Sequence, residues 1–219
     1  MKEIKVLNLY ACLGGNRYKW DEVVEEANVK MTVTAIELDK ELARLYQERF
    51  PNDTVIVTDA HQYLLDHYKE FDFIWSSPPC PTHSNINISQ YTRESWNPRF
   101  PDMKLYEEII FLKSFFKGSF IVENVIPYYQ PLILASKRGR HLYWSNFIIP
   151  NFKGRESKIR EWQIPQLEDF HEISLSNYNG TQNKRKIGRN LVDYEAGRII
   201  FETYLGIERK KDVRQTSMF

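Results

Sequence analysis

Apolar and polar positions follow two different periods along the first two thirds of the chain, and the two periods alternate. Short apolar runs typical of buried strands occupy 4–10, 31–37, 54–57, 71–75 and 120–123. Stretches with apolar residues at helical spacing occupy 18–27, 39–50, 62–68 and 105–116. Strands that alternate with helices at this spacing predict an α/β domain with a mostly parallel sheet and right-handed crossovers over residues 1–135.

The pattern is less regular after residue 135. An apolar run predicts one more strand over 141–149, and helical periodicity predicts a helix over 194–205. Residues 151–185 are polar and without a clear period, which is typical of a loop-rich segment or a small subdomain. Residues 208–219 form a charged tail with an apolar end.

Charge is balanced over the 219 residues but not along them. Lys and Arg total 30 against 29 Asp and Glu, so the net charge of +1 excludes a globally basic nucleic-acid coat and an acidic solvating tail. Residues 1–75 carry a balance of −5 and residues 76–219 one of +6. The asymmetry has two interpretations, which are chance segregation of solvated faces or a second half that meets a polyanion.

The sequence indicates a reduced, cytoplasmic, soluble protein. Cys12 and Cys80 lie far apart, and neither stands in a metal-ligand spacing, so no metal is expected. The N-terminus lacks a signal-peptide hydrophobic region, and no apolar run approaches the ~18 residues that suggest a membrane span.

Suitable groups for a nucleotide cofactor follow the first three predicted strands. Ligands of open α/β sheets bind at the carboxyl ends of the strands. A turn of small residues, 10–15, follows the first strand and lets backbone approach a ligand, although a plain tight turn would look the same. Glu37 ends the second strand and suits ribose hydroxyls, and Asp59 ends the third, placed to accept from an adenine amino group. Either carboxylate alone would more simply be solvated surface.

A cysteine and a carboxylic acid follow the next two strands. Prolines on both sides of Cys80 hold the segment Ser76–Pro81 stiff and present the thiol outward. Glu123 leaves the apolar run 120–122 and is expected near Cys80, across neighbouring strand ends. A thiol beside a carboxylic acid suggests covalent catalysis on an electron-poor ring, with the acid holding a ring nitrogen. His83 is close to Cys80 in sequence, which does not establish a pairing.

Motifs that contain these residues resemble those of the DNA (cytosine-5)-methyltransferases, which use S-adenosylmethionine. The stretch VLNLYACLGGNRYKW resembles the family's first motif, DLFAGIGGFR, and AIELDKELARLYQERFP resembles the second. SSPPCP and IVENV resemble the catalytic Pro-Cys and Glu-Asn-Val motifs. Residues 58–60, 137–140 and 188–192 resemble the third, the Arg-x-Arg and the last motif. The matches stand in the family's order and cover about 4–145 and 186–205.

The resemblance implies a small bacterial or phage-type enzyme with a Rossmann-like S-adenosylmethionine-dependent methyltransferase fold and a reduced target-recognition region. Its implied catalytic residues are Cys80, Glu123, Arg140 and Arg138. Its implied cofactor-binding residues are Tyr10, Ala11, Cys12, Gly14, Gly15, Glu37, Leu38, Asp59, Ala60, Pro79, Asn190 and Val192. Its implied partner is double-stranded DNA, whose cytosine would be flipped from the stack and methylated at C5 through a Cys80 adduct, in the setting of restriction–modification.

The same resemblance predicts how the chain is divided. Residues 1–145 form the catalytic domain, 146–186 the target-recognition region, 187–207 a helix that returns to the catalytic domain, and 208–219 a flexible tail. Asn8 and Cys12 depart from the usual Asp and Gly, which puts cofactor affinity in question. Two alternatives stay open, an RNA cytosine-5 methyltransferase and a catalytically silent DNA-binding or regulatory subunit.

Three further segments invite functional interpretations. Residues 82–104, with Ser84, Asn85, Asn87, Ser89 and Arg93, form a polar loop that could close over flipped DNA or be ordinary surface. Lys184, Arg185, Lys186 and Arg189 form a basic cluster suited to phosphates or to solvent. The terminal Gln215, Met218 and Phe219 resemble a peptide that docks into bacterial sliding clamps.

Overall fold

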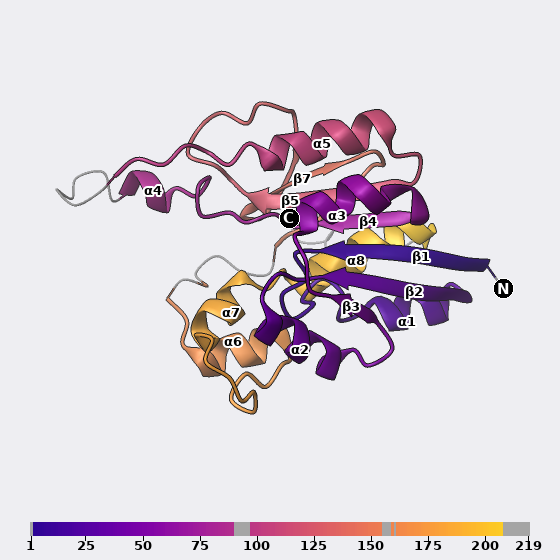
Figure 1. Ribbon diagram of the computed structural model, residues 1–219, viewed down its shortest axis with the longest axis horizontal. Coiled ribbons are helices and arrows are strands. Elements are labelled where there is room, and N and C mark those ends of the chain that lie inside the picture. Colours follow the sequence, from indigo (N-terminus) through magenta and orange to yellow (C-terminus); the bar gives the residue numbers. More distant parts are fainter. Residues whose placement is uncertain (1, 90–96, 155–158, 160, 208–219) are drawn as a thin grey trace, which may run out of the picture.

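A seven-stranded sheet runs through the centre of the computed structural model, which describes residues 2–89, 97–154, 159 and 161–207 (Figure 1). The strands are β1 (Lys2–Leu9), β2 (Val29–Ile36), β3 (Thr54–Ile56), β4 (Phe73–Ser76), β5 (Ser119–Val125), β6 (Ser136–Arg138) and β7 (His141–Ser145). They lie in the order β3-β2-β1-β4-β5-β7-β6. The first five are parallel, and β7 pairs antiparallel with both β5 and β6. The predicted α/β fold with a mostly parallel sheet is confirmed.

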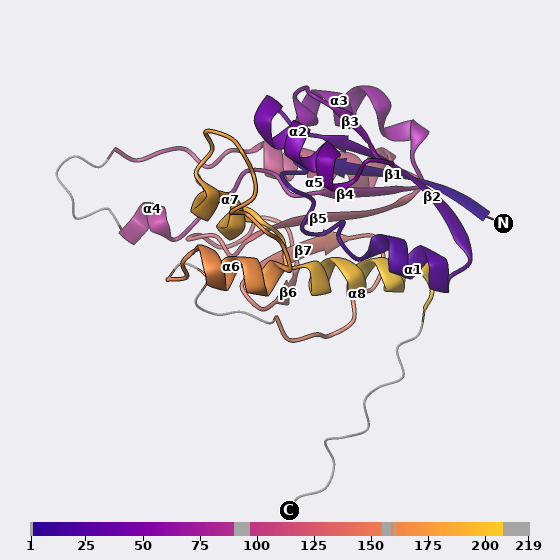
Figure 2. The same cartoon turned by 90° about the horizontal axis from the view of Figure 1, so that it is seen from below.

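Helices cover both faces of this sheet. They are α1 (Trp20–Glu26), α2 (Lys40–Arg49), α3 (Ala60–His67), α4 (Ile86–Ser89), α5 (Lys104–Phe115), α6 (Ile164–His171), α7 (Lys184–Asn190) and α8 (Tyr194–Leu205), with a 3-10 turn at Tyr68–Glu70. Figures 1 and 2 show α3 and α5 on one face and α1 and α8 on the other. The side chains of β1 alternate between these two faces. Leu7 and Leu9 pack with α3 and α5, whereas Ile4 and Val6 pack with α1 and α8.

Aspartates fix where three of the helices begin. The Asp39 side chain accepts from the backbone N–H groups of residues 41 and 42, and Asp59 and Asp193 cap α3 and α8 in the same way. The helix expected from residue 62 therefore begins at Ala60, directly after its cap. These caps also fix carboxylates at the ends of the strands that precede α2 and α3.

Two features of the second half differ from the prediction. The strand expected over 141–149 ends at Ser145, where the Ser145 hydroxyl donates to the Phe147 carbonyl (2.6 Å) and the chain turns. The segment 151–185 contains a complete helix, α6, and the first residues of α7. Gln163 and Gln166 form a capping box at the start of α6. This capping box marks the helix although the sequence around it lacks a clear hydrophobic period.

No helix in the part of the chain that the structure describes has the length and apolar character of a membrane span. Arg93, Gln215, Met218 and Phe219 lie outside the described residues, so the structure bears on neither the role predicted for Arg93 nor the clamp peptide.

The last helix packs against the first strand and helix of the chain. Trp20 of α1 stacks on Phe201 of α8 with ring centroids 4.7 Å apart, and both rings are fully buried. The two backbones approach so closely that a Cβ at Gly197 would lie 2.3 Å from the Asn16 carbonyl oxygen. Glycine at 197 is therefore required by the space between α8 and the turn after β1, not by its backbone conformation.

Replacing Gly197 by alanine tests this contact by the sign of its effect. Alanine favours an isolated helix by about 1 kcal/mol over glycine. Here the methyl group would overlap backbone that has little room to shift, so we expect Gly197→Ala to lower the free energy of unfolding by about 1–3 kcal/mol. Urea denaturation followed by circular dichroism measures the change, and an unchanged or increased stability would contradict the close approach.

Candidate active site

The predicted site residues of β1, β2, β4 and β5 gather at one edge of the sheet. These four strands are parallel neighbours, so their carboxyl ends meet there. The register pairs Leu9 with both Ile36 and Ser76, and Ser76 in turn with Val122. The segments that follow each of these residues therefore begin level with one another.

The turn after β1 is held in an unusual backbone conformation. Tyr10, Cys12 and Gly14 have positive φ angles of 56°, 48° and 65°. For a non-glycine residue this conformation costs roughly 1–2 kcal/mol. The Ala11 N–H donates to the Ile36 carbonyl (3.0 Å) and the Cys12 N–H to Glu37 Oε2 (2.9 Å), which secures the turn against β2. Backbone strain of this kind is concentrated at functional sites.

Glu37 is fixed by the same contacts. Its Oε1 accepts from the Asp39 N–H (3.0 Å) and its Oε2 from the Cys12 N–H (2.9 Å). A carboxylate has about four lone-pair sites, so two backbone donors leave acceptor capacity for two hydroxyl groups. Leu38, the next residue, is 67% exposed and offers apolar surface beside this carboxylate. An acceptor for hydroxyls beside an exposed apolar side chain fits an adenosine.

The third strand end contributes Asp59 and Ala60. Asp59 Oδ1 accepts from the Gln62 N–H (2.9 Å), and Asp59 is exposed to solvent, whereas Ala60, the first residue of α3, is buried. Asp59 thus lies in the segment between β3 and α3, and its contact with adenine stays a prediction.

The last motif reaches the first turn through Val192 rather than through Asn190. A Cβ at Gly15 would lie 2.4 Å from the Val192 carbonyl oxygen, so the two backbones touch. Asn190 ends α7 and is exposed. The segment before α7 also docks on α2, because Glu41 accepts from the backbone N–H groups of Thr181 and Gln182 (2.9 Å each).

The loop Ser77–Pro81, here the nucleophile loop, is tied to β5 by one side chain. Asn124 Nδ2 donates to the Pro78 carbonyl (2.9 Å), and this bond is buried. The Cys80 carbonyl accepts from the N–H groups of His83 (3.0 Å) and Ser84 (3.1 Å), which turns the chain directly after the cysteine. Pro79 is exposed and Cys80 half-buried, so the loop presents both at the surface of the edge.

Glu123 is buried on the neighbouring strand, beside a histidine that sequence reasoning missed. His141 Nε2 lies 3.6 Å from Glu123 Oε1. Tyr143 is the register partner of Glu123, and burial, followed by the Glu123 charge, raises the pKa of its phenol. The signal for His141 was present in the sequence as a polar residue that opens an apolar strand, directly after Arg140.

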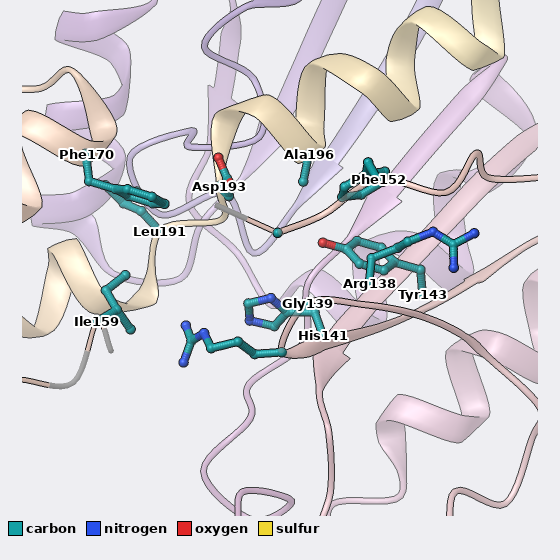
Figure 3. A pocket seen from close by; sticks show the side chains of 12 residues that line it. Arg138, Gly139, His141, Tyr143, Phe152, Ile159, Phe170, Leu191, Asp193 and Ala196 are labelled. Carbon is teal, nitrogen blue, oxygen red and sulfur yellow. The ribbon is translucent and has the colours of Figure 1, made fainter. Parts of the chain in front are cut away.

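The side chains of His83 and Arg138 have partners away from the cysteine. The His83 ring nitrogen Nδ1 bonds the Tyr129 hydroxyl, and burial lowers the pKa of His83. The Arg138 guanidinium donates to the carbonyls of Pro150 (2.7 Å) and Ile149 (2.8 Å). Figure 3 shows Arg138 directed away from His141 in the pocket that both line with Arg140, Tyr143 and Asp193. Arg138 thus holds the segment after β7.

The basic cluster of α7 is also partly engaged. Lys184 Nζ donates to the Ser176 carbonyl (2.9 Å) and Arg185 Nε to the Trp162 carbonyl (2.9 Å), while Lys186 is exposed. Burial and the Arg185 charge lower the pKa of Arg189. Among the described residues there is no group of three or more His, Cys, Asp or Glu that could hold a metal ion.

Residues 4–128 match the family model of the C-5 cytosine-specific DNA methylases. The chain belongs to this family. This match confirms the predicted family and S-adenosylmethionine as the cofactor. The glycine contacts, the fixed Glu37 and the exposed Leu38 fit that cofactor. Cytosine-5 methylation is accordingly the chemistry of this methylase family member.

The fold of a solved methyltransferase structure agrees with that of the family. The Entamoeba histolytica methyltransferase EhMeth matches with a TM-score of 0.53 at 11% identity, over 94% of this chain and 98% of that one. A mutant of Spodoptera frugiperda DNMT2 matches with a TM-score of 0.41 at 18% identity, over 70% of this chain and 54% of that one. No curated protein sequence matches. The Rossmann-like methyltransferase fold predicted from the sequence is confirmed.

The two cysteines of this methylase are expected to differ in reactivity. Burial, followed by the Glu37 charge, raises the pKa of Cys12 to about 12, so Cys12 stays a protonated thiol near neutral pH. We expect iodoacetamide at pH 8 to alkylate Cys80 and to leave Cys12 unmodified, since the thiolate is the reactive form. Peptide mass spectrometry measures both sites. A Cys80→Ala chain is the control, and alkylation of Cys12 in its folded form would contradict the protected thiol.

Proposed function

We propose that this chain transfers a methyl group from S-adenosylmethionine to C5 of cytosine in DNA, through a covalent bond between Cys80 and C6 of a flipped base. The observation that carries the proposal is the buried bond from Asn124 to the Pro78 carbonyl. It ties the loop of the candidate nucleophile to the strand of the candidate acid, Glu123. Family membership supports the chemistry, and this bond supports the assignment of the two residues.

In the proposed mechanism each residue acts on one atom of the ring. The Cys80 thiolate forms a bond to C6, while Glu123 holds a proton at N3 and so favours the negative charge moved into the ring. Arg140 lies in the pocket beside His141 and takes the O2 side, whereas the Arg138 guanidinium holds the carbonyls of Ile149 and Pro150. His141, next to Glu123, helps to keep that carboxyl oriented.

When bound, S-adenosylmethionine supplies the methyl group as an electrophile. In our proposal the cofactor is held at the strand ends by backbone and side-chain groups from several elements. These are the turn 10–15, Glu37, Leu38, Asp59, Ala60, Pro79, Asn190 and Val192. Once C5 carries the methyl group, transfer of the C5 proton to a water molecule restores the C5–C6 double bond and expels the Cys80 thiolate. The nucleophile is thereby regenerated without any external reductant or oxidant.

The proposed DNA contacts lie on two sides of the strand ends. Figure 1 shows α4 and its neighbours on one side and α6 with α7 on the other. The segment 82–104 is pinned near its base, where the Thr82 hydroxyl accepts from the Asp102 N–H (3.0 Å). Residues 146–186 serve as the target-recognition region in this proposal. The positive balance of residues 76–219 supports contact with a polyanion.

A covalent trap tests the mechanism. Cytosine with fluorine at C5 cannot lose a proton there after methylation, so the bond from Cys80 to C6 persists. We expect a DNA duplex containing 5-fluorocytosine to form a denaturation-resistant adduct in the presence of S-adenosylmethionine, and Cys80→Ala to abolish it. We expect Glu123→Gln to slow the adduct by roughly 10²–10⁴-fold, the usual contribution of a general acid. Denaturing gel electrophoresis measures both.

Matched substrates separate the alternatives. The duplex supplied for the trap carries random sequence around each 5-fluorocytosine, because the target sequence is unknown, and a transfer-RNA pool with the same base is tested in parallel. An adduct with RNA alone would replace DNA by RNA as the substrate. No adduct with either, in a chain that binds S-adenosylmethionine, would overturn the proposal in favour of a silent subunit.

A further inference from the structure

A carboxylate lies in the middle of the apolar face of α5. This helix buries Leu105, Tyr106, Ile109 and Leu112 against the sheet, and Glu108 shares their face with a fully buried side chain. A leucine there would continue the stripe at no desolvation cost, whereas a buried carboxylate is costly unless it is fully hydrogen-bonded. The position therefore calls for an explanation beyond core packing.

Three segments of the chain meet on this one carboxylate. Glu108 Oε1 accepts from the Tyr10 hydroxyl (2.6 Å) and lies 3.0 Å from His61 Nδ1, while Oε2 accepts from the Ser76 hydroxyl (2.6 Å). The Glu108 hydrogen bond raises the pKa of His61, which favours the charged imidazolium beside the carboxylate. Burial and the Glu108 charge raise the pKa of Tyr10, which keeps its phenol a donor.

The partners belong to different parts of the active site. Tyr10 lies in the turn after β1 at a positive φ, so its backbone conformation needs support from its surroundings. Ser76 ends β4 and directly precedes the nucleophile loop. His61 lies in the first turn of α3, which begins at the cap Asp59. Figure 1 shows α3 and α5 on the same face of the sheet, above β4.

We propose that Glu108 is a positioning residue that fixes the turn 10–15, here called the cofactor turn, and the nucleophile loop relative to each other. The names of the turn and the loop rest on the proposed function, but the bonds themselves do not. Glu108 touches neither the substrate nor the cofactor in this proposal. It sets the spacing between Tyr10 and Ser76, and through them the distance over which the methyl group must pass to the base held at Cys80.

The test looks for effects that cross from one segment to the other. Ser76→Ala removes one oxygen on the nucleophile side, and we expect it to weaken S-adenosylmethionine binding about tenfold, the size of one charge-assisted hydrogen bond. Tyr10→Phe removes one oxygen on the cofactor side, and we expect it to change the rate of Cys80 alkylation severalfold. Glu108→Gln should produce both changes. Titration calorimetry and timed mass spectrometry measure them.

Glu107→Gln is the matched control. Glu107 is the neighbouring carboxylate on α5, 61% exposed, and its contact is with His61 Nε2 at 3.2 Å. We expect this variant to keep the affinity and the alkylation rate of the unchanged chain. A purely structural role for Glu108 would lower the melting temperature and leave both readouts unchanged in the folded protein. That result would overturn the proposal.

The design separates this proposal from the proposed function. Cofactor affinity and thiol alkylation need neither DNA nor RNA, so a failure of the covalent trap leaves them interpretable. If Glu108→Gln fails to fold, Ser76→Ala and Tyr10→Phe carry the test, because each removes a single hydroxyl. Their double variant should show less than the sum of the single effects, since both act through one carboxylate. The proposal is contradicted if the effects of the two single variants add fully in the double variant and neither variant alters the readout of the other segment.

Discussion

Two close backbone contacts, each possible only at a glycine, join the segment after β1 to α8 and the residues before it. Gly15 leaves room for the Val192 carbonyl, and Gly197 leaves room for the Asn16 carbonyl. Both contacts fall on the segment between β1 and α1, directly beside the strained turn at Tyr10 and Cys12. The cofactor turn is thus shaped by the last motif as much as by the first strand, and the remaining contacts of the edge are arranged around it.

Local patterns predicted much of the fold because burial in a three-layer α/β protein imposes a period on each element. The candidate residues Glu37, directly after β2, and Glu123, within β5, followed from that pattern alone. The role of Glu108 did not, because helical spacing shows that a position is buried but not which distant hydroxyls reach it. Helix α6 was missed since its apolar residues pack on several short elements rather than on the sheet.

The departures from the family motif have a local physical account. Asn8 Oδ1 accepts from Asn16 Nδ2 (2.8 Å), and both side chains are buried. The neutral amide that stands where the family usually has Asp thus has a neutral partner. Cys12 occupies a glycine position at a positive φ of 48°, and its N–H bond to Glu37 helps to offset the strain.

The position of α8 has a consequence for biosynthesis. Trp20 and Phe73 emerge from the ribosome long before the ring that covers them, Phe201 of α8. Their side of the sheet must therefore wait, with apolar surface uncovered, until α8 has been synthesised. Contacts that span so much sequence also slow folding. A nascent chain interrupted before α8 would lack both that cover and the rear support of the cofactor turn, so premature fragments should be inert and chaperone-dependent.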